Sequence, residues 1–365
     1  MPQWWNSLYQ TFTQLRHRNA FVKGAERYPS AKIAANQATI ICWSHPLSLS
    51  PKLIRQFLIW LVIGLTVYGI MTVVFSDFDA IKASVAKVGW LGWTTILALS
   101  TFNILVRFGR WQLYLNSLGH PVPAGPSLQY FLAGFAFTST PAKAGEALRS
   151  LYLKKHDVSY PESLGALFVE RLTDLIAVIL FALAAAYPFE EYRWLVFLAG
   201  ALTLSMLPLV HSQFLRRQLA QLADKIGNSK IKAGITHIID LITSSAALLK
   251  SGPLYGGMAL SLIAALAVCT IMYLVLMLLG AEISFTLAIG IYATGILVGA
   301  LSFLPGGIGS AELVMIGLLM LAGVDKTTAT AATLVCRIAA MWYSIALGIV
   351  AVLRLEFFQN AQEND

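Results

Sequence analysis

Two distant stretches of this chain repeat the same order of helix-breaking and charged residues. The first reads Pro141-Ala-Lys-Ala-Gly145-Glu146, and Arg171 follows 25 residues after its glutamate. The second reads Pro305-Gly-Gly-Ile-Gly309-Ser-Ala-Glu312, and Arg337 also follows 25 residues after its glutamate. Because both stretches interrupt apolar sequence, they predict an internal repeat whose copies each contain a broken helix and a charge pair.

The chain is 57% hydrophobic and only 12% charged, whereas soluble domains carry about 25% charged residues. Residues 56–75 and 254–279 contain no charged side chain, and both runs reach the roughly 20 residues that span a bilayer. This composition predicts an all-α polytopic membrane protein with about six full transmembrane helices and two re-entrant helical hairpins in inverted repeats. The predicted crossings lie near residues 56–75, 89–106, 164–187, 194–211, 254–279 and 327–353.

Two apolar stretches do not fit a single crossing. Residues 127–140 number only 14, which is too short to span a bilayer. Residues 284–323 are long enough to cross once, but the breakers at 305–309 divide them into about 20 and 13 residues. We expect both stretches to form re-entrant hairpins, because broken helices are tolerated at membrane depth only where protein or a wet cavity surrounds them.

Basic residues give the orientation, because they are retained on the cytoplasmic side of a membrane. With the N-terminus inside, 20 of the 26 Lys and Arg residues fall in predicted cytoplasmic segments and four in outer loops. This predicts a multi-pass protein of the cell (inner or plasma) membrane with both termini cytoplasmic and two inverted halves. The predicted boundaries are a basic N-terminal segment at 1–52, a transmembrane domain at 53–355 with repeats at about 53–188 and 192–355, and a short tail at 356–365.

In the first copy, a helix is predicted to begin at Thr140-Pro141, and Pro141 and Gly145 act as the hairpin breakers. This helix carries Lys143, Glu146 and Arg149 at positions i, i+3 and i+6. One interpretation is a solvated cytoplasmic face with local ion pairs. The other is a half-helix whose positive N-terminal end faces an anionic headgroup and whose charged side chains bind it.

In the second copy, Pro305 breaks the helix, and Gly306, Gly307 and Gly309 remove side chains from the turn. Backbone amides can then approach a ligand closely, and we expect Ser310 to cap the next half-helix. A tight loop that serves only helix packing is the alternative interpretation.

Charged side chains also interrupt two of the predicted crossings. Glu170, Arg171 and Asp174 lie within residues 164–187, and Arg337 lies within residues 327–353. Each centrally placed charge costs about 2.5–3.5 kcal/mol to insert, so partners are expected for all four.

The spacing of these charges suggests their partners. Arg171 and Asp174 are spaced i, i+3, so they can pair along one helix face. The equal glutamate-to-arginine spacing in the two copies predicts the pairs Glu146–Arg171 and Glu312–Arg337. A buried pair with a purely structural role is the alternative to a substrate-binding pair.

Other patterns exclude several kinds of chemistry. Arg107 and Arg110-Trp111 are explained by snorkelling and aromatic anchoring at the inner interface. The six histidines and three cysteines lack metal-ligand or disulfide-framework spacing. No GxxxxGK(S/T), GxGxxG or GxSxG motif is present, so we expect no cofactor, and the net charge of +8 is explained by membrane orientation, not by nucleic-acid binding.

Four motifs occur in one order across roughly residues 55–355 and together resemble a known family. They are Arg107-Phe-Gly-Arg110-Trp, Thr140-Pro-Ala-Lys-Ala-Gly145-Glu146-Ala-Leu-Arg149, Glu170-Arg171-Leu-Thr-Asp174 and Leu304-Pro-Gly-Gly-Ile-Gly309-Ser-Ala-Glu312. The combination resembles the lysylphosphatidylglycerol synthase transmembrane region, a flippase-like membrane family. The resemblance implies lipid translocation, or assistance to lipid-linked synthesis, in the cytoplasmic membrane. The best-known members carry a C-terminal aminoacyl-transferase domain, which has no counterpart here, so lysyl transfer is not expected.

Two function classes follow. The preferred one is a flippase-like or scramblase-like transporter for an anionic or amphipathic lipid headgroup, with Lys143, Arg171 and Arg337 attracting phosphate. Its partner is a membrane phospholipid or a polyprenyl-linked lipid, and a homo-oligomer is compatible with the sequence. The alternative is an intramembrane enzyme, or an accessory subunit in glycolipid or lipid-linked precursor synthesis, with Glu146 and Asp174 as acid/base groups. An enzyme needs one site in one half, whereas transport requires both copies.

Overall fold

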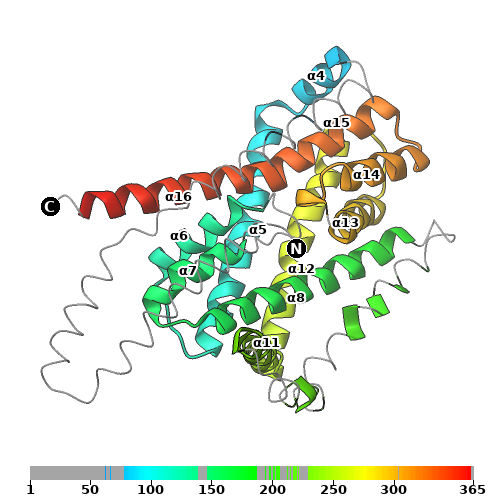
Figure 1. Ribbon diagram of the computed structural model, residues 1–365. Helices are drawn as coiled ribbons and strands as arrows, with labels where there is room; N and C mark the ends of the chain where they lie inside the picture. The colour runs from blue at the N-terminus through cyan, green and yellow to red at the C-terminus, as the bar shows by residue number, and fades with distance from the viewer. Residues whose placement is uncertain are drawn as a thin grey trace, which may run out of the picture. The chain divides into compact units, whose positions relative to one another are not determined.

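The computed structural model describes residues 78–138, 146–186, 229–302 and 304–362, with isolated positions at 62 and 66 and between 194 and 221. Every regular element in these residues is helical, which confirms the all-α class (Figure 1). The predicted crossings at 56–75 and 194–211 lie outside the described residues apart from those isolated positions. The helices named below are α4 (Phe78–Lys87), α5 (Gly89–Ser117), α6 (Ala124–Phe135), α7 (Arg149–Leu153), α8 (Tyr160–Ala186), α11 (Ser229–Leu248), α12 (Ser251–Leu278), α13 (Phe285–Leu301), α14 (Ser310–Leu321), α15 (Lys326–Arg337) and α16 (Tyr343–Gln362).

Three of the described helical segments are long and apolar enough to cross a membrane: Gly89–Ser117, Ser251–Leu278 and Lys326–Leu355. They coincide with the crossings predicted at 89–106, 254–279 and 327–353, although α5 continues well beyond its predicted end. The crossing predicted at 164–187 corresponds to α8, a helix of 27 residues with charged side chains near its middle.

The ends of α5 and α12 show the internal repeat in the backbone. Gly119 (φ 87°) and Gly280 (φ 81°) follow the two helices in the left-handed region that glycine adopts most easily. In both turns the next amide donates to the carbonyl five residues earlier, at 3.0 Å after α5 and 2.9 Å after α12. This shared helix-ending turn supports the alignment of Gly119 with Gly280 as equivalent positions of the two copies.

The two corresponding helices α5 and α12 pack against each other in antiparallel orientation. Asn103 Nδ2 donates to the Ala264 carbonyl at 2.6 Å, and these two residues are themselves equivalent positions of the repeat. Towards the N-terminal end of α5, Gly92 lies against Leu278 at the C-terminal end of α12. This pair of equivalent helices therefore runs in opposite directions, as the predicted inverted repeats require.

Each copy also contains a pair of packed helical arms. In the second copy these are α13 and α14, joined through a 3₁₀ turn at Pro305–Gly307. In the first copy they are α6 and α7, and part of the tip between them lies outside the described residues. Since α6 and α13 begin at equivalent positions, Ala124 and Phe285, the two hairpins occupy the same place in the repeat.

The hairpins contact the long helices of the opposite copy. The arm α13 packs along α8, and Gly348 of α16 lies so close to the end of α6 that a Cβ there would be 2.2 Å from the Ala136 amide nitrogen. Helix α11 packs on α8 around Gly165. These contacts build the region where the copies meet.

Candidate functional site

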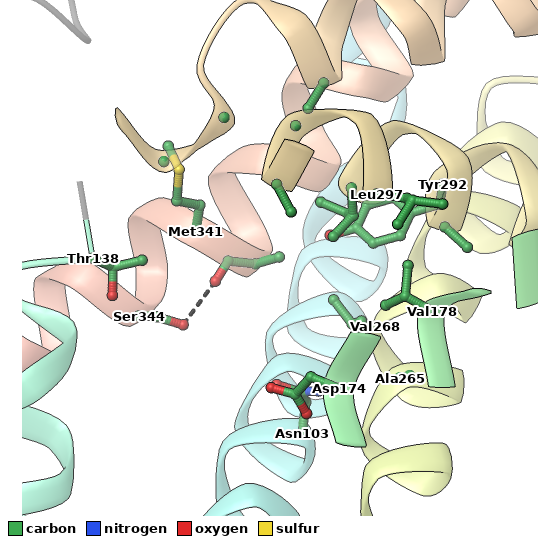
Figure 2. Close-up of a pocket in the computed structure, with 18 of the residues that line it drawn as sticks. Asn103, Thr138, Asp174, Val178, Ala265, Val268, Tyr292, Leu297, Met341 and Ser344 are labelled. Atoms are coloured by element: carbon green, nitrogen blue, oxygen red, sulfur yellow. Dashed lines mark hydrogen bonds between the residues drawn. The ribbon is translucent and has the colours of Figure 1, made fainter. Parts of the chain in front are cut away.

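A cavity of about 320 Å³ lies between the two copies. Its lining comes from α5 and α8 of the first copy, α12 and α13 of the second, both hairpin tips and the first residues of α16. Figure 2 shows Asn103 and Asp174 on one side of the cavity and Tyr292 and Leu297 on another. Side chains from both halves of the repeat therefore line the cavity.

The first charge pair borders this cavity. Arg171 Nη2 lies 3.4 Å from Glu146 Oε2 and 3.4 Å from Asp174 Oδ2. Thr138 Oγ1 donates to the other oxygen of Glu146 at 3.3 Å. The predicted Glu146–Arg171 pair and the predicted i, i+3 pair with Asp174 are both present, so Arg171 is shared between two carboxylates.

The second charge pair is shorter and more fully bonded. Arg337 Nε donates to Glu312 Oε1 at 2.5 Å, and Arg337 Nη2 donates to the Gly306 carbonyl at 2.8 Å. Glu312 Oε2 accepts the amide of Gly309 at 2.7 Å and thereby caps α14. The predicted Glu312–Arg337 pair is confirmed, and it holds the hairpin tip to the helix that carries Arg337.

The glycines of this tip adopt conformations that other residues avoid. Gly306, Gly307 and Gly309 have φ values of 60°, 65° and 90°. Gly307 also lies against α13, where a Cβ would approach Gly299 Cα to 2.9 Å. The tight packing loop is therefore present, and Gly306 and Gly307 also line the cavity. The prediction that Ser310 caps α14 is wrong, because the residue before it occupies the cap position and Ser310 Oγ donates to a loop carbonyl at 3.2 Å.

A π-helical turn, Ile338–Trp342, follows Arg337 directly. The equivalent stretch of α8, after Arg171, is regular α-helix. The wider turn places Met341 Sδ 3.2 Å from Arg337 Nη2, and π-turns often occur at functional sites. Arg337 therefore contacts a carboxylate, a backbone carbonyl and a sulfur atom.

Arg110 lies behind the cavity and is fully buried. Its Nη1 donates to Asp174 Oδ1 at 2.5 Å and to the Ser261 hydroxyl, and its Nη2 lies 3.9 Å from Glu170 Oε1. The interpretation of Arg110 as a snorkelling residue at the interface is wrong, because α5 extends to Ser117 and places this side chain among α8 and α12. Arg107, one turn earlier, lines the cavity and donates to Asp174 Oδ2 at 3.3 Å.

Arg149 and Glu170 form another buried ion pair, which lies behind the cavity next to Arg110. The guanidinium of Arg149 also lies 3.9 Å from the centre of the Trp111 ring, within cation–π range. Both charged residues are at most 2% exposed. Neither lines the cavity, and Arg149 is not the solvated residue that one interpretation of its spacing predicts.

The structure brings most of the predicted site residues to one place. Those lining the cavity are Glu146, Arg171, Asp174, Gly306, Gly307 and Arg337. Gly309 and Glu312 stand next to its lining tip, and Lys143, Pro141 and Gly145 lie outside the described residues. The sequence reasoning missed Arg107, Asn103 and Tyr292 as lining residues. The spacing of Arg107 and Arg110, one helix turn apart in an apolar helix, was a signal for a buried network.

Charged and apolar side chains both line the cavity, and each copy contributes both kinds. The first copy supplies Arg107, Arg171 and Asp174 together with Val178, and the second supplies Val268 and Leu297 together with Arg337. A molecule with a charged head and an apolar body matches such a lining. Among the described residues, no three His, Cys, Asp or Glu side chains gather into a group suited to a metal ion.

Comparison with known proteins gives a family and several relatives. The model of the family "lysylphosphatidylglycerol synthase TM region" matches residues 58–348. A UPF0104 membrane protein of Pyrococcus horikoshii is 25% identical over 289 residues, which cover 69% of this chain and 83% of that protein. A UPF0104 membrane protein of Methanothermobacter thermautotrophicus is 45% identical over 91 residues, but these span only 25% of this chain and 27% of the relative.

Proposed function

The chain belongs to the lysylphosphatidylglycerol synthase transmembrane region family, and from its central cavity we propose that it is a membrane lipid transporter of the flippase type. The proposed cargo is a lipid with an anionic or amphipathic headgroup, either a phospholipid or a polyprenyl-linked lipid. The observation that carries this proposal is the amphipathic cavity, which both copies of the repeat line and which both charge pairs border.

The repeat suggests how such a cavity would work. Equivalent helices of opposite direction allow the same site to open towards either face by related movements. We propose that the two hairpins are re-entrant and enter from opposite sides of the membrane. Opening on one side would separate one hairpin from its arginine, while the other pair stays closed.

Exchange of ion-pair partners would allow the protein to change between two states without nucleotide hydrolysis. Glu146 and Asp174 already share Arg171, so an arriving headgroup can displace one carboxylate without leaving the guanidinium unpaired. Breaking the Glu312–Arg337 pair would free the second hairpin tip, since Arg337 also binds a carbonyl of that tip. For Arg171, exchange of partners therefore offers a path between states in which the guanidinium stays paired, whereas movement of the second hairpin requires a buried pair to separate.

Reconstitution tests the proposal. The full chain in liposomes should move a fluorescent lipid with a phosphate headgroup between leaflets without ATP, as reported by dithionite quenching of the outer leaflet. Arg171→Ala and Arg337→Ala should each abolish movement in protein that remains folded, because an alternating site needs both halves. Arg354→Gln, which removes an exposed arginine, is the matched control and should retain movement.

A different result would favour the enzyme or accessory-subunit alternative. Chemical conversion of the lipid, or full activity of Arg337→Ala, would indicate a single site in one half. Mass spectrometry of the recovered lipid distinguishes conversion from movement in the same sample.

A further inference from the structure

Two buried arginine nitrogens at the cavity lack a hydrogen-bond acceptor among the described residues: Nε of Arg107 and Nε of Arg171. Both residues line the cavity, and their Nη2 atoms lie 3.3 and 3.4 Å from the same oxygen, Asp174 Oδ2. A guanidinium presents five N–H donors in a fixed fork, and unsatisfied buried donors are costly. The two guanidinium groups thus meet at one point of the wall, where they share Asp174 Oδ2.

Arg337, the third arginine of the lining, is bonded differently. Its Nε donates to Glu312 and its Nη2 to the Gly306 carbonyl and to Met341 Sδ. These bonds hold the second hairpin tip, and they turn the guanidinium towards protein acceptors. Arg337 therefore acts as a brace of the hairpin tip, with a side chain only 5% exposed. The side chains of Arg107 and Arg171 are 19% and 27% exposed and can meet a ligand in the cavity.

Charge balance limits what such a ligand can be. Salt bridges connect four arginines (Arg107, Arg110, Arg149 and Arg171) with three carboxylates (Glu146, Glu170 and Asp174). Each carboxylate forms a salt bridge with at least one guanidinium group. Among the described residues this network retains one positive charge in excess. An uncompensated charge in a low-dielectric site is unfavourable, so one negative charge balances the described part of this network.

The apolar part of the lining indicates where the rest of the ligand lies. At the position equivalent to Arg107, the second copy has Val268, which lines the same cavity. Val178 of α8 and Leu297 of α13 extend this apolar part (Figure 2). An anionic group at Arg107 therefore has apolar surface beside it, as a lipid headgroup with its chains requires.

We propose that Arg107 and Arg171 form the headgroup seat of this cavity and select a lipid whose headgroup carries one net negative charge, as a phosphodiester does. The proposal rests on the proposed transport function and adds the substrate class and a residue, Arg107, that binds it. A zwitterionic headgroup would bring its cation towards the arginines, and a phosphomonoester would bring up to two negative charges.

Native mass spectrometry of the full-length protein in detergent tests the seat. Dioleoyl phosphatidylglycerol, phosphatidic acid and phosphatidylcholine are titrated separately, and the fraction of one-to-one complex is measured. We expect wild-type protein to bind phosphatidylglycerol at least about tenfold more tightly than phosphatidylcholine, the size of one charge-assisted hydrogen bond. Phosphatidic acid should bind more weakly than phosphatidylglycerol, because its second charge exceeds the excess of the network.

Variants of Arg107 separate binding from folding. Arg107→Gln should lose about tenfold in phosphatidylglycerol affinity and leave phosphatidylcholine unchanged, and Arg107→Lys should recover part of the loss through its charge. Arg354→Gln, an exposed control, should bind as wild type. Thermal unfolding without lipid establishes that each variant is folded before its affinity is compared.

Three outcomes would overturn the proposal. They are equal binding of the three lipids, unchanged phosphatidylglycerol affinity in folded Arg107→Gln, or displacement of the lipid by an equal concentration of inorganic phosphate, which would indicate a site for free anions. Charge-selective binding through Arg107 without movement of lipid in liposomes would reject the transport function and keep the seat. Movement of lipids regardless of headgroup charge would reject the seat and keep the transport function.

Discussion

The two copies of the repeat share a backbone but fill it with different chemistry. Both end their first long helix in the same glycine turn, and both pair a hairpin glutamate with an arginine at the same spacing along the chain. Around the first pair, however, the chain buries further arginines and carboxylates. When the copies are aligned on their glycine turns and on their hairpin glutamates, the positions of Arg107, Arg110, Trp111, Arg149, Glu170 and Asp174 correspond to Val268, Ile271, Met272, Met315, Cys336 and Ala340.

Contacts among these positions differ between the two copies. In the first copy, Arg149 stacks on Trp111 and pairs with Glu170. In the second copy, Met272 stands at the position of Trp111 and Cys336 at the position of Glu170, and their sulfur atoms lie 3.8 Å apart. The scaffold thus tolerates either an ionic or an apolar filling, so stability alone does not explain the ionic one.

This contrast indicates that the duplicated pair and the additional charges have separate roles. The second pair is tight, buried and bonded to its hairpin tip, whereas in the first copy Arg171 is shared between two carboxylates and 27% exposed. Within the transport proposal, the second copy holds its hairpin closed over the cavity, and the arginines of the first copy bind the lipid headgroup. Four measurements test this division, starting with the largest expected effect.

Sidedness is an all-or-none property of inverted copies. Single cysteines at Lys143 and Leu304, in a background without Cys42, Cys269 and Cys336, should react with membrane-impermeant thiol reagents from opposite faces only. Leu304 is 46% exposed and suits a reporter, whereas Gly307 does not, because its φ is positive and a Cβ would strike Gly299. Labelling of both positions from one face would end the inverted arrangement, and permeabilised membranes provide the control in which both react.

Sequence reasoning located the repeat and both charge pairs because the equal spacing from glutamate to arginine is written in the chain. It misjudged residues whose neighbours come from other helices. Arg110 looked like an interfacial arginine until its partners on α8 and α12 were known. The cap at Gly309 was missed for a related reason: a glycine offers no capping side chain, and the carboxylate of Glu312 performs that role from within α14. Local patterns predicted elements, and only packing revealed which charges face the cavity.

The strength of the two pairs should differ as their geometry does. Removing one partner of the buried Glu312–Arg337 pair strands a charge and should cost about 3–5 kcal/mol, while the double variant should recover part of this loss. The Glu146–Arg171 pair should show a smaller coupling energy, below about 2 kcal/mol, because Asp174 remains as a partner and solvent reaches Arg171.

Double-mutant cycles on unfolding in detergent measure both couplings, with Glu312→Gln and Arg337→Gln in one cycle and Glu146→Gln and Arg171→Gln in the other. Equal coupling energies for the two pairs would contradict the proposed difference between Glu312–Arg337, which braces the hairpin, and Glu146–Arg171, which shares its arginine with Asp174. Additive effects in both cycles would show that the pairs contribute nothing to stability.

Helix packing within the hairpins offers a smaller contrast. Gly134 and Gly295 are equivalent positions, but an added Cβ would lie 3.4 Å from the Glu146 carbonyl in the first hairpin and 2.4 Å from Met315 Cγ in the second. Gly295→Ala should destabilise the protein by about 1–3 kcal/mol through overpacking. Gly134→Ala should be close to neutral, because the higher helix propensity of alanine, up to about 1 kcal/mol, offsets the closer contact. Unfolding of the two variants under the same conditions checks the sign, and a larger loss at Gly134 would contradict the described packing.

The smallest predicted difference concerns the caps of α8 and α15. Ser159 Oγ accepts the Glu162 amide at 3.4 Å in the first copy, and at the equivalent position of the second copy Asp325 Oδ1 accepts the Thr328 amide at 2.9 Å. The hydrogen bond from Thr328 holds the pKa of Asp325 below its ordinary value of 3.8. Stability from this cap is therefore fully present above about pH 4 and is lost as the pH falls through the lowered pKa. Asp325→Ala should cost about 1 kcal/mol at pH 7.

Asp325→Asn separates the cap from its titration, because asparagine caps a helix about as well as aspartate but does not ionise. Its stability at pH 7 should match wild type, and its loss of stability between pH 5 and about pH 3 should be smaller than that of wild type. Ser159→Ala is the corresponding variant in the first copy, where the Ser159 hydroxyl also donates to Glu162 Oε2 at 2.6 Å. Burial raises the pKa of Glu162, but the hydrogen bonds from Ser159 outweigh it and hold this pKa below its ordinary value. The cost of Ser159→Ala should therefore also be larger at pH 7 than at about pH 3. An identical dependence of stability on pH for wild type and Asp325→Asn would show that the charge of Asp325 does not contribute to the cap.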